Sequence, residues 1–235
     1  MRLNFYILGF LLFTSFQTYA QFEQDTAFLN QLISESEEFR NQSDFQMAFV
    51  KLQEASDYYE NTPVDFPPLK SHLFRLIGGL YLDAGQYEVA LKTFEEGLNF
   101  ALENYEETDG KVLRMYLDIG IANYYLANFD VALLNYEYTE NLALKSMGAE
   151  NRLLYNCYNN IGICYYKKHN YKKALGYYKK AIDIGKKLGQ KNDKRLASAY
   201  NNIGICYKEL QDFNQAITFY NKAKAIKLNL FSEDH

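Results

Sequence analysis

The side chains best suited to specific recognition chemistry are asparagines that occur in two neighbouring pairs. Asn159 with Asn160, and Asn201 with Asn202, stand in two copies of the segment Tyr-Asn-Asn-Ile-Gly-Ile-Cys-Tyr. A carboxamide both donates and accepts hydrogen bonds, so it can pair with the backbone of a bound polypeptide. The two pairs therefore indicate a peptide-binding surface. The alternative, that these amides only cap or brace neighbouring helices, stays open.

Residue types that perform catalysis or bind metals are few and scattered. The three histidines are His72, His169 and His235, and no spacing among them resembles a metal site. The chain has no glycine-rich phosphate loop, no His-Glu-x-x-His and no Gly-x-Ser-x-Gly. The sequence therefore predicts a protein that is not an enzyme and that uses no cofactor and no metal.

The three cysteines are Cys157, Cys164 and Cys206, and an odd number excludes a fully paired disulfide framework. Cys164 and Cys206 occupy equivalent places in successive copies of a repeat. Equivalent positions on neighbouring helices lie about 8–10 Å apart, whereas a disulfide needs Cα atoms within about 7 Å. We interpret all three as small buried residues rather than ligands or nucleophiles.

The elements that must position these side chains follow from a repeat with one fixed period. Residues of the same type recur every 42 positions in three columns of the sequence. These columns are a glycine column (Gly78, Gly120, Gly162, Gly204), an alanine column (Ala48, Ala90, Ala132, Ala174, Ala216) and an aromatic column (Phe45, Tyr87, Phe129, Tyr171, Phe213).

Each copy of the repeat has the pattern of two helices joined by a turn. Apolar residues fall at i, i+3, i+4 and i+7, which is the spacing of one helix face. In the fourth copy the two faces comprise Tyr158, Ile161, Gly162 and Tyr165, and then Ala174, Tyr178 and Ala181. Glycine and alanine fit positions where two helices cross, because a larger side chain would push the backbones apart. The sequence predicts an all-α fold.

The pattern resembles the tetratricopeptide repeat, whose signature is aromatic-x-x-Leu-Gly-x-x-Tyr followed by Ala-x-x-x-aromatic. Two copies match it at six positions, namely Phe74, Ile77, Gly78, Tyr81, Ala90 and Phe94, and Tyr200, Ile203, Gly204, Tyr207, Ala216 and Tyr220. The third copy departs at Asn123, and the first has Ser36 for glycine and Leu52 for the aromatic residue. The resemblance implies a right-handed superhelical solenoid of about five helix-turn-helix units.

The domain organisation expected from this pattern is one repeat domain, residues 21–235, after a short leader. The repeats are placed at about residues 25–62, 67–108, 109–150, 151–190 and 193–231. Their period of 42 residues exceeds the usual ~34. The expected joins contain Pro63, Pro67 and Pro68, then Asp109-Gly110, and then Gly189-Gln190.

The leader, residues 1–20, has the pattern of a secretory signal peptide. Arg2 precedes an apolar run from Tyr6 to Phe13, and Thr18-Tyr19-Ala20 is a small-x-small cleavage site. The run is shorter than the ~20 residues that a membrane anchor needs. We therefore expect a periplasmic or secreted protein whose mature chain begins at Gln21, and no later segment is long and apolar enough to cross a membrane.

The resemblance implies that the first helices of the repeats line a concave groove. On those helices, residues three or four apart share a side, which places one side of each first helix in the groove. The candidate peptide-binding residues are Asn156, Asn159, Asn160, Ile163 and Tyr166 in the fourth copy, Asn201, Asn202, Ile205 and Lys208 in the fifth, and Tyr124 in the third, where Ile121 is also expected to face the groove.

Charge is divided unevenly along the chain. Residues 21–150 hold 8 Lys and Arg against 23 Asp and Glu, whereas residues 151–230 hold 16 against 4. Lysine pairs recur every seven residues at Lys172/Lys173, Lys179/Lys180 and Lys186/Lys187. Three interpretations are open: a solvated convex face, contact between acidic and basic ends, or attraction to an anionic membrane or polymer. Nucleic acid is disfavoured, because the whole chain is acidic.

These observations favour a non-catalytic scaffold that binds a peptide or protein segment in its concave groove. The alternative function comes from a second resemblance. Exported repeats of this long period resemble the sensor region of bacterial two-component-type proteins, in which a histidine kinase or DNA-binding domain follows, and no such output domain occurs in this sequence. The expected partner is a protein or peptide and not nucleic acid, with contact to a membrane surface, but no spanning segment, as an open alternative.

Overall fold

The computed structural model describes residues 2–62, 66–189 and 194–233, and all regular secondary structure in these ranges is α-helical. This confirms the expected all-α fold class. The helices are α1 (Arg2–Asn41), α2 (Phe45–Asn61), α3 (Pro67–Asp83), α4 (Tyr87–Asn104), α5 (Gly110–Tyr125), α6 (Phe129–Ser146), α7 (Arg152–Lys167), α8 (Tyr171–Lys187), α9 (Lys194–Glu209) and α10 (Phe213–Glu233).

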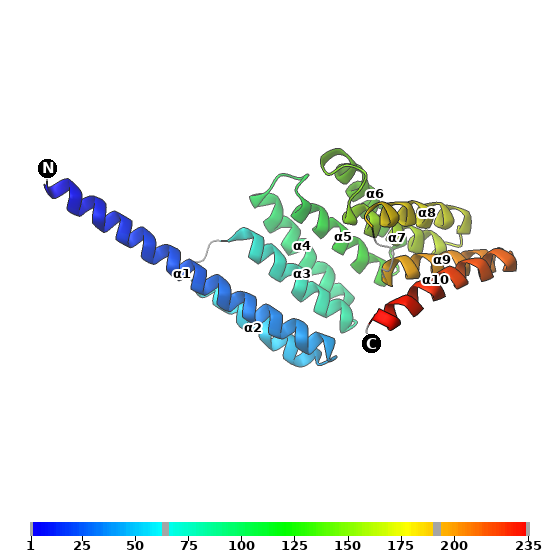
Figure 1. Cartoon of the computed structure of the whole chain (residues 1–235), viewed down its shortest axis with the longest axis horizontal. Helices are drawn as coiled ribbons and strands as arrows, with labels where there is room; N and C mark the ends of the chain where they lie inside the picture. Colours follow the sequence, from blue (N-terminus) through cyan, green and yellow to red (C-terminus); the bar gives the residue numbers. More distant parts are fainter. Residues whose placement is uncertain (1, 63–65, 190–193, 234–235) are drawn as a thin grey trace. The chain divides into compact units, whose positions relative to one another are not determined.

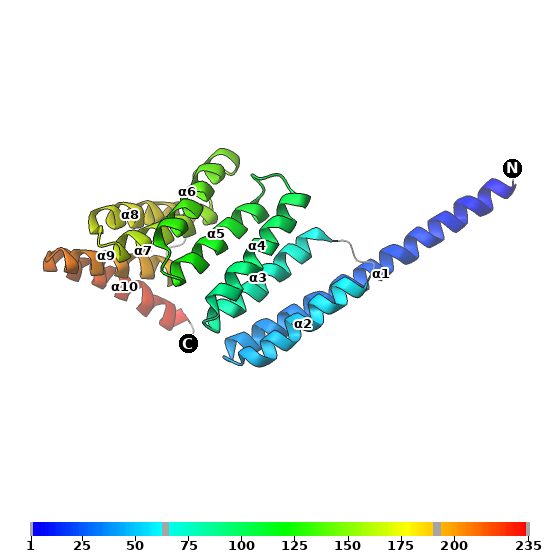
Figure 2. The same ribbon diagram turned by 180° about the vertical axis from the view of Figure 1, so that it is seen from behind.

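The chain divides into two compact units, residues 1–93 and 94–235, with the boundary inside α4. In the first unit, α1 packs against α2 and α2 against α3 (Figures 1 and 2). Its core is built on leucines that these helices turn inward, among them Leu29, Leu52 and Leu80, each almost completely buried. Burial of these apolar faces, rather than intrinsic propensity, holds the helices together.

In the second unit, from α5 onward, each helix packs against its successor in the chain, so that α5/α6, α7/α8 and α9/α10 form antiparallel pairs (Figure 1). Two further contacts matter for function. Helix α7 also touches α5, and α9 also touches α7. The first helices of three successive pairs therefore lie side by side, with Leu154, Ile161 and Ile203 buried between the layers.

Within each pair of the second unit, the two helices cross where a glycine meets a tyrosine ring. A Cβ atom on Gly162 would lie 2.6 Å from Cε1 of Tyr178, and one on Gly204 would lie 2.6 Å from Cε1 of Tyr220. Gly120 has the same relation to Tyr136. A larger residue cannot occupy the glycine position without moving the ring, which explains why the sequence keeps glycine there.

The turn between paired helices uses a left-handed residue at five positions spaced 42 apart: Ser43, Gly85, Ala127, His169 and Gln211. Only one of these is glycine, the residue to which this conformation costs least. The next residue caps the second helix in three of the turns, where the side chains of Asp44, Asn170 and Asp212 accept backbone N–H groups.

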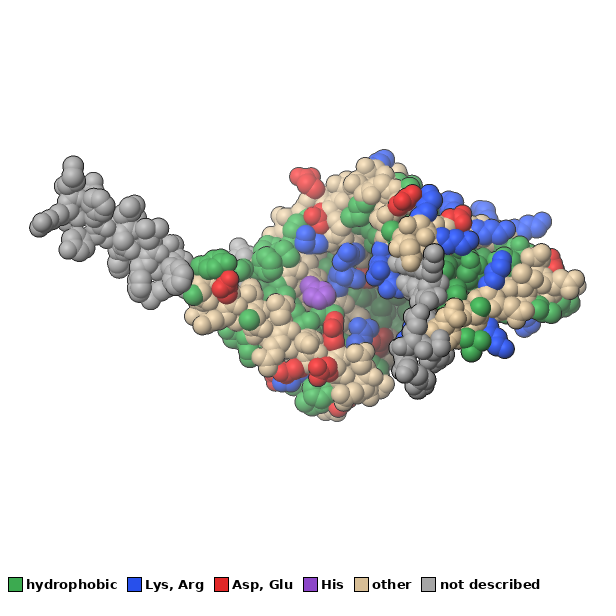
Figure 3. All heavy atoms as spheres, in the orientation of Figure 1, with side chains coloured by type: hydrophobic (Ala, Val, Ile, Leu, Met, Phe, Trp, Pro, Cys, Tyr) green, Lys and Arg blue, Asp and Glu red, His purple; other side chains and the backbone are tan. Residues whose placement is uncertain are grey.

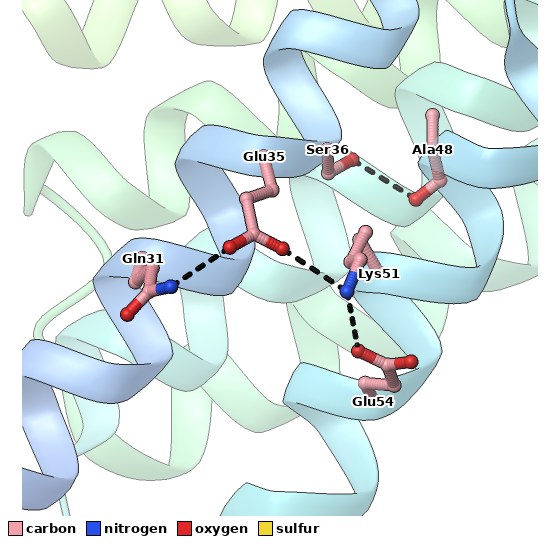
Figure 4. Close-up of polar contacts among 6 residues, drawn as sticks. All are labelled: Gln31, Glu35, Ser36, Ala48, Lys51 and Glu54. Carbon is pink, nitrogen blue, oxygen red and sulfur yellow. Dashed lines mark hydrogen bonds and ion pairs between the residues drawn. The ribbon is translucent and has the colours of Figure 1, made fainter.

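The first crossing, between α1 and α2, differs in both partners. Ser36 stands in the glycine column, and its hydroxyl donates a 3.0 Å hydrogen bond to the carbonyl of Ala48 on α2 (Figure 4). Leu52 stands where the other pairs have a ring, and it is buried. Beside this crossing Glu35 pairs with Lys51 at 3.0 Å and accepts from Gln31 at 2.8 Å (Figure 4).

Some of the features expected from the sequence involve residues that the structure describes only in part or not at all. Pro63 and Gln190, expected in the joins, and the side chains of residues 1–18 lie outside the described residues. Helix α1 runs without a break through the expected cleavage point after Ala20 and ends at Asn41. Cleavage after Ala20 stays a prediction. Within the described part of the chain, no helix combines the length and apolarity that a membrane span requires.

Candidate functional site

Two adjacent hollows lie on the second unit, over its first helices. The first hollow, of about 240 Å³, lies between α5 and α7. The second hollow, of about 260 Å³, lies between α7 and α9. The first hollow is lined by Ile121, Tyr124, Tyr125, Tyr136, Asn160 and Ile163, and the second by Tyr124, Ile163, Tyr166, Lys167, Tyr178, Asn202 and Ile205.

The two hollows have the same construction, displaced by one helix pair. Asn160 and Ile163 border the first hollow from α7, and Asn202 and Ile205 border the second from α9 in the same places. Ile163 and a tyrosine of α5 line both hollows. The hollows are therefore consecutive parts of one groove that runs across α5, α7 and α9.

The innermost wall of each hollow is a tyrosine from the second helix of a pair. Tyr136 of α6 and Tyr178 of α8 reach past Gly120 and Gly162, which leave room for their rings. Both residues are almost completely buried. Burial raises the pKa of both hydroxyls above the ordinary tyrosine range, so they remain protonated near neutral pH.

The structure brings six of the ten candidate residues into these hollows. They are Tyr124, Asn160, Ile163, Tyr166, Asn202 and Ile205. The other four, Asn156, Asn159, Asn201 and Lys208, lie on the same helices but are not among the residues that line the two hollows.

Asn159 shows why neighbouring asparagines differ. Its amide Nδ2 donates a 3.2 Å hydrogen bond to the carbonyl of Tyr155, one turn earlier on α7. Asn160, one residue later, points to a different side of the helix and borders the first hollow. The hydrogen bond of Asn159 therefore fits an asparagine that only braces its own helix. The position of Asn160 fits an asparagine that could contact a ligand in the hollow.

Sequence reasoning missed four lining residues, Tyr125, Tyr136, Lys167 and Tyr178. Tyr136 and Tyr178 stand at the aromatic position of the second helix, whereas the candidate groove residues were sought on the first helices alone. The signal that could have found them is the glycine opposite. A glycine lets the ring pass between the helices, so its far edge reaches the groove.

The lining of the two hollows is apolar with hydrogen-bonding groups and little charge. None of its described residues carries a carboxylate, and Lys167 is its one ammonium group. Asparagine amides and tyrosine hydroxyls supply the polar atoms, while the isoleucines supply apolar contact. This mixture is typical of a site that holds an uncharged or weakly acidic ligand by shape and hydrogen bonds.

The lysine pairs of α8 divide into two kinds. The second lysine of each pair makes contacts within the fold: Lys173 lies 4.9 Å from the centre of the Tyr165 ring, Lys180 lies 3.6 Å from Glu140, and Lys187 lies 3.1 Å from Glu150. All six lysines of these pairs are exposed, Lys172, Lys179 and Lys186 as well as the three that make these contacts. Figure 3 shows basic side chains gathered over the part of the second unit where α8 lies.

The cysteines are free and fully buried in α7 and α9. Burial raises the pKa of the Cys164 and Cys206 thiols to about 12, which suppresses the reactive thiolate. Among the described residues no group of three or more His, Cys, Asp or Glu could hold a metal ion.

The repeated helix pairs, their glycine–aromatic crossings and the groove over the first helices define a solenoid of the tetratricopeptide type. Residues 147–229, which include α7, α8 and α9, match the tetratricopeptide repeat family. No curated protein matches the sequence.

Solved structures with the same fold support this class. BtubC (BKLC) from P. vanneervenii is 23% identical, with a TM-score of 0.76 over 91% of this chain and 85% of BtubC. A Rap protein in complex with Competence and Sporulation Factor is 18% identical, with a TM-score of 0.71 over 83% of this chain and 52% of its own. The Rap conjugation gene regulator of plasmid pLS20, in complex with the Phr* peptide, is 14% identical, with a TM-score of 0.73 over 87% of this chain and 54% of its own.

Proposed function

We propose that this protein is a non-catalytic scaffold that binds a peptide segment of a partner in the groove across α5, α7 and α9. The observation that carries the proposal is the repetition of one hollow. Asn160 and Asn202 border equivalent hollows one helix pair apart. A ligand that extends along the groove meets the same groups twice, which suits a polymer with a regular backbone.

The chemistry of the lining supports a peptide as that polymer. A side-chain amide satisfies both the N–H and the C=O of a peptide unit, which an ammonium or a carboxylate alone does not. The similar Rap fold is solved with the Phr* peptide in one structure. That likeness concerns the fold, and it supports peptide binding in this chain only together with the asparagine positions.

The test is capture of a partner from cell extract by the whole chain and by variants. The variant Asn160→Ala with Asn202→Ala removes both amides from the hollows and leaves the helix crossings intact. We expect it to lose at least about tenfold in affinity for the captured partner, since two hydrogen bonds of about 1 kcal/mol each disappear.

The matched control is Asn156→Ala with Asn201→Ala, on the same two helices but outside the hollows. It should bind as the unchanged chain does. If both double variants lose the partner equally, or if neither does, the asparagines of the hollows are structural and the groove is not the binding site. Far-ultraviolet circular dichroism checks that every variant is folded.

We also propose that the scaffold acts after export, on the strength of the leader pattern in residues 1–20. Amino-terminal sequencing of the protein isolated from its native cells provides the test. A mature chain that begins at Gln21 is the expected result, and a retained residue 1–20 segment would contradict it.

A further inference from the structure

The inner wall of each hollow presents a hydroxyl that the fold does not use. Tyr136 and Tyr178 are only 1% and 2% exposed. Among the residues that the structure describes, neither hydroxyl has a hydrogen-bond partner, and neither is among the side-chain oxygens that are fully shut off from solvent and unpaired. At the same position in α4 the chain has Phe94, which is 1% exposed and so fills its place as completely. A ring without a hydroxyl is therefore buried as completely at this position of a second helix.

A ligand that closes a hollow must pair with this hydroxyl. In the open groove, water can satisfy it. A ligand that displaces this water with an apolar group leaves a buried donor unpaired, which costs free energy, whereas an oxygen acceptor at the same place restores the bond. A tyrosine is protonated near neutral pH and burial raises the pKa of both hydroxyls further, so both present a donor.

The lining of the hollows also indicates which kind of ligand side chain would fit into them. Ile163 lines both hollows and Ile205 lines the second, so an aliphatic stem finds apolar contact. None of the described lining residues carries a carboxylate. However, Asp118 acts electrostatically on Tyr136 and Glu209 on Tyr166, so an uncharged carbonyl tip meets less repulsion than a carboxylate. A side chain with an aliphatic stem and a carbonyl oxygen at its tip fits both features.

We propose that the groove recognises a peptide segment with two such side chains, of the glutamine or glutamate type, one in each hollow, where Tyr136 and Tyr178 donate hydrogen bonds to their tips. The inference rests on the proposed function and names its ligand class. It assigns the two tyrosines as specificity-determining residues, while the amides of Asn160 and Asn202 hold the peptide backbone.

The spacing of the two side chains follows from the helix packing. Helices α5, α7 and α9 contact one another in order, and packed helices lie about 8–10 Å apart. An extended or polyproline-type chain advances about 3.1–3.4 Å per residue. The two inserted side chains are therefore about three residues apart in the ligand.

The experiment is a selection of random linear dodecapeptides displayed on phage against the whole chain, followed by affinity measurements on the enriched peptides by fluorescence anisotropy. We expect glutamine or glutamate to be enriched at two positions about three residues apart. The variant Tyr136→Phe with Tyr178→Phe should bind an enriched peptide about tenfold more weakly, the penalty of an unpaired buried acceptor.

Two controls separate recognition from stability. Tyr220→Phe removes the same hydroxyl from the last crossing, over Gly204, where the residue lines neither hollow. Its affinity should be unchanged. Replacement of both selected glutamines or glutamates in the peptide by leucine should reverse the preference, because the leucine peptide leaves the tyrosine hydroxyls of the unchanged chain unpaired and the double phenylalanine variant has no such donors.

The outcomes distinguish this inference from the proposed function. Enriched peptides that carry only apolar residues at the two positions, or that bind the double phenylalanine variant as tightly as the unchanged chain, would overturn the inference. If those peptides still require Asn160 and Asn202, the groove remains a peptide-binding site. Failure to enrich any peptide that depends on these asparagines would overturn both.

Discussion

The crossing of α1 with α2 and the crossing of α7 with α8 fill equivalent positions with different residue pairs. In the first, Ser36 faces a helix that carries Leu52, and its hydroxyl is satisfied by the carbonyl of Ala48. In the second, Gly162 faces the ring of Tyr178. A large ring requires a glycine opposite, while a smaller leucine leaves room for serine. The pair, rather than either residue alone, is the unit that the fold specifies.

The two crossings also differ in whether the side chain of the second helix reaches a hollow on the surface. The tyrosine of α8 passes the glycine and reaches the second hollow. A leucine with a serine opposite buries its whole side chain, as Leu52 does. The glycine–tyrosine crossing thus connects packing with the candidate site, and the serine–leucine crossing is packing alone. Substitutions at the two crossings test this difference.

The largest effect is expected for Gly162→Leu. A Cβ at this position would lie 2.6 Å from Cε1 of Tyr178, and the leucine side chain adds further atoms there. Overpacking of this kind costs about 3 kcal/mol, which urea unfolding followed by circular dichroism would measure.

The matched control for this substitution is Gly176→Leu on α8. No atom lies within 4 Å of a Cβ placed on Gly176, so leucine should be tolerated there and should gain up to about 1 kcal/mol from its better helix propensity. An equal loss of stability at both positions would show that the register assigned to the crossing is wrong.

A slightly smaller effect is expected when a ring is placed in the first crossing. Leu52→Tyr introduces a ring opposite Ser36, whose Cβ and hydroxyl occupy the space that glycine leaves free elsewhere. We expect a loss of about 2 kcal/mol in the free energy of unfolding.

The same experiment includes its rescue. Addition of Ser36→Gly to Leu52→Tyr rebuilds the pair found in α7 and α8, so the double variant should be more stable than the single tyrosine variant. The coupling energy from this double-mutant cycle should be about 1 kcal/mol or more in favour of the pair. Additive effects of the two substitutions would contradict the view that the pair acts as a unit.

The third effect concerns the serine hydroxyl. Ser36→Ala removes the 3.0 Å hydrogen bond to the carbonyl of Ala48 and leaves the packing of Leu52 unchanged. The expected loss is about 1 kcal/mol. Ser34→Ala, at an exposed position on the same helix, should change stability little, and thermal unfolding of both variants gives the comparison.

The fold was largely predictable because its determinants are periodic in the sequence. Small residues such as Gly162 and Ala174 mark helix crossings by their type and spacing alone, and the turn between the helices is marked by the interruption around His169. The register of the first helices pointed to Asn159 and Asn201 as groove residues, whereas Asn160 and Asn202 were candidates because they adjoin the segment that holds the repeat glycine. The latter two border the hollows, and their role in binding stays a prediction.

What the sequence did not reveal depends on neighbouring helices in three dimensions. Asn156 and Asn201 share a helix side with groove residues but fall outside the hollows, because a hollow is bounded by two first helices and the ring beneath them. Tyr136 and Tyr178 come from the second helices, so no pattern within a first helix identifies them. That these two tyrosines line the hollows becomes clear only when the packing of each ring past the glycine opposite is known.

The smallest effect on stability is expected for Tyr178→Phe. Its ring packs over Gly162, but its hydroxyl has no hydrogen-bond partner among the described residues. Phe94 is buried at the equivalent position of α4, so the free energy of unfolding should change by less than about 0.5 kcal/mol. Chemical denaturation would detect a larger loss, which would mean that the hydroxyl stabilises the fold and is not kept for a ligand. An unchanged stability leaves recognition in the groove as the reason for tyrosine at this position, and that is what separates this crossing from the one between α1 and α2.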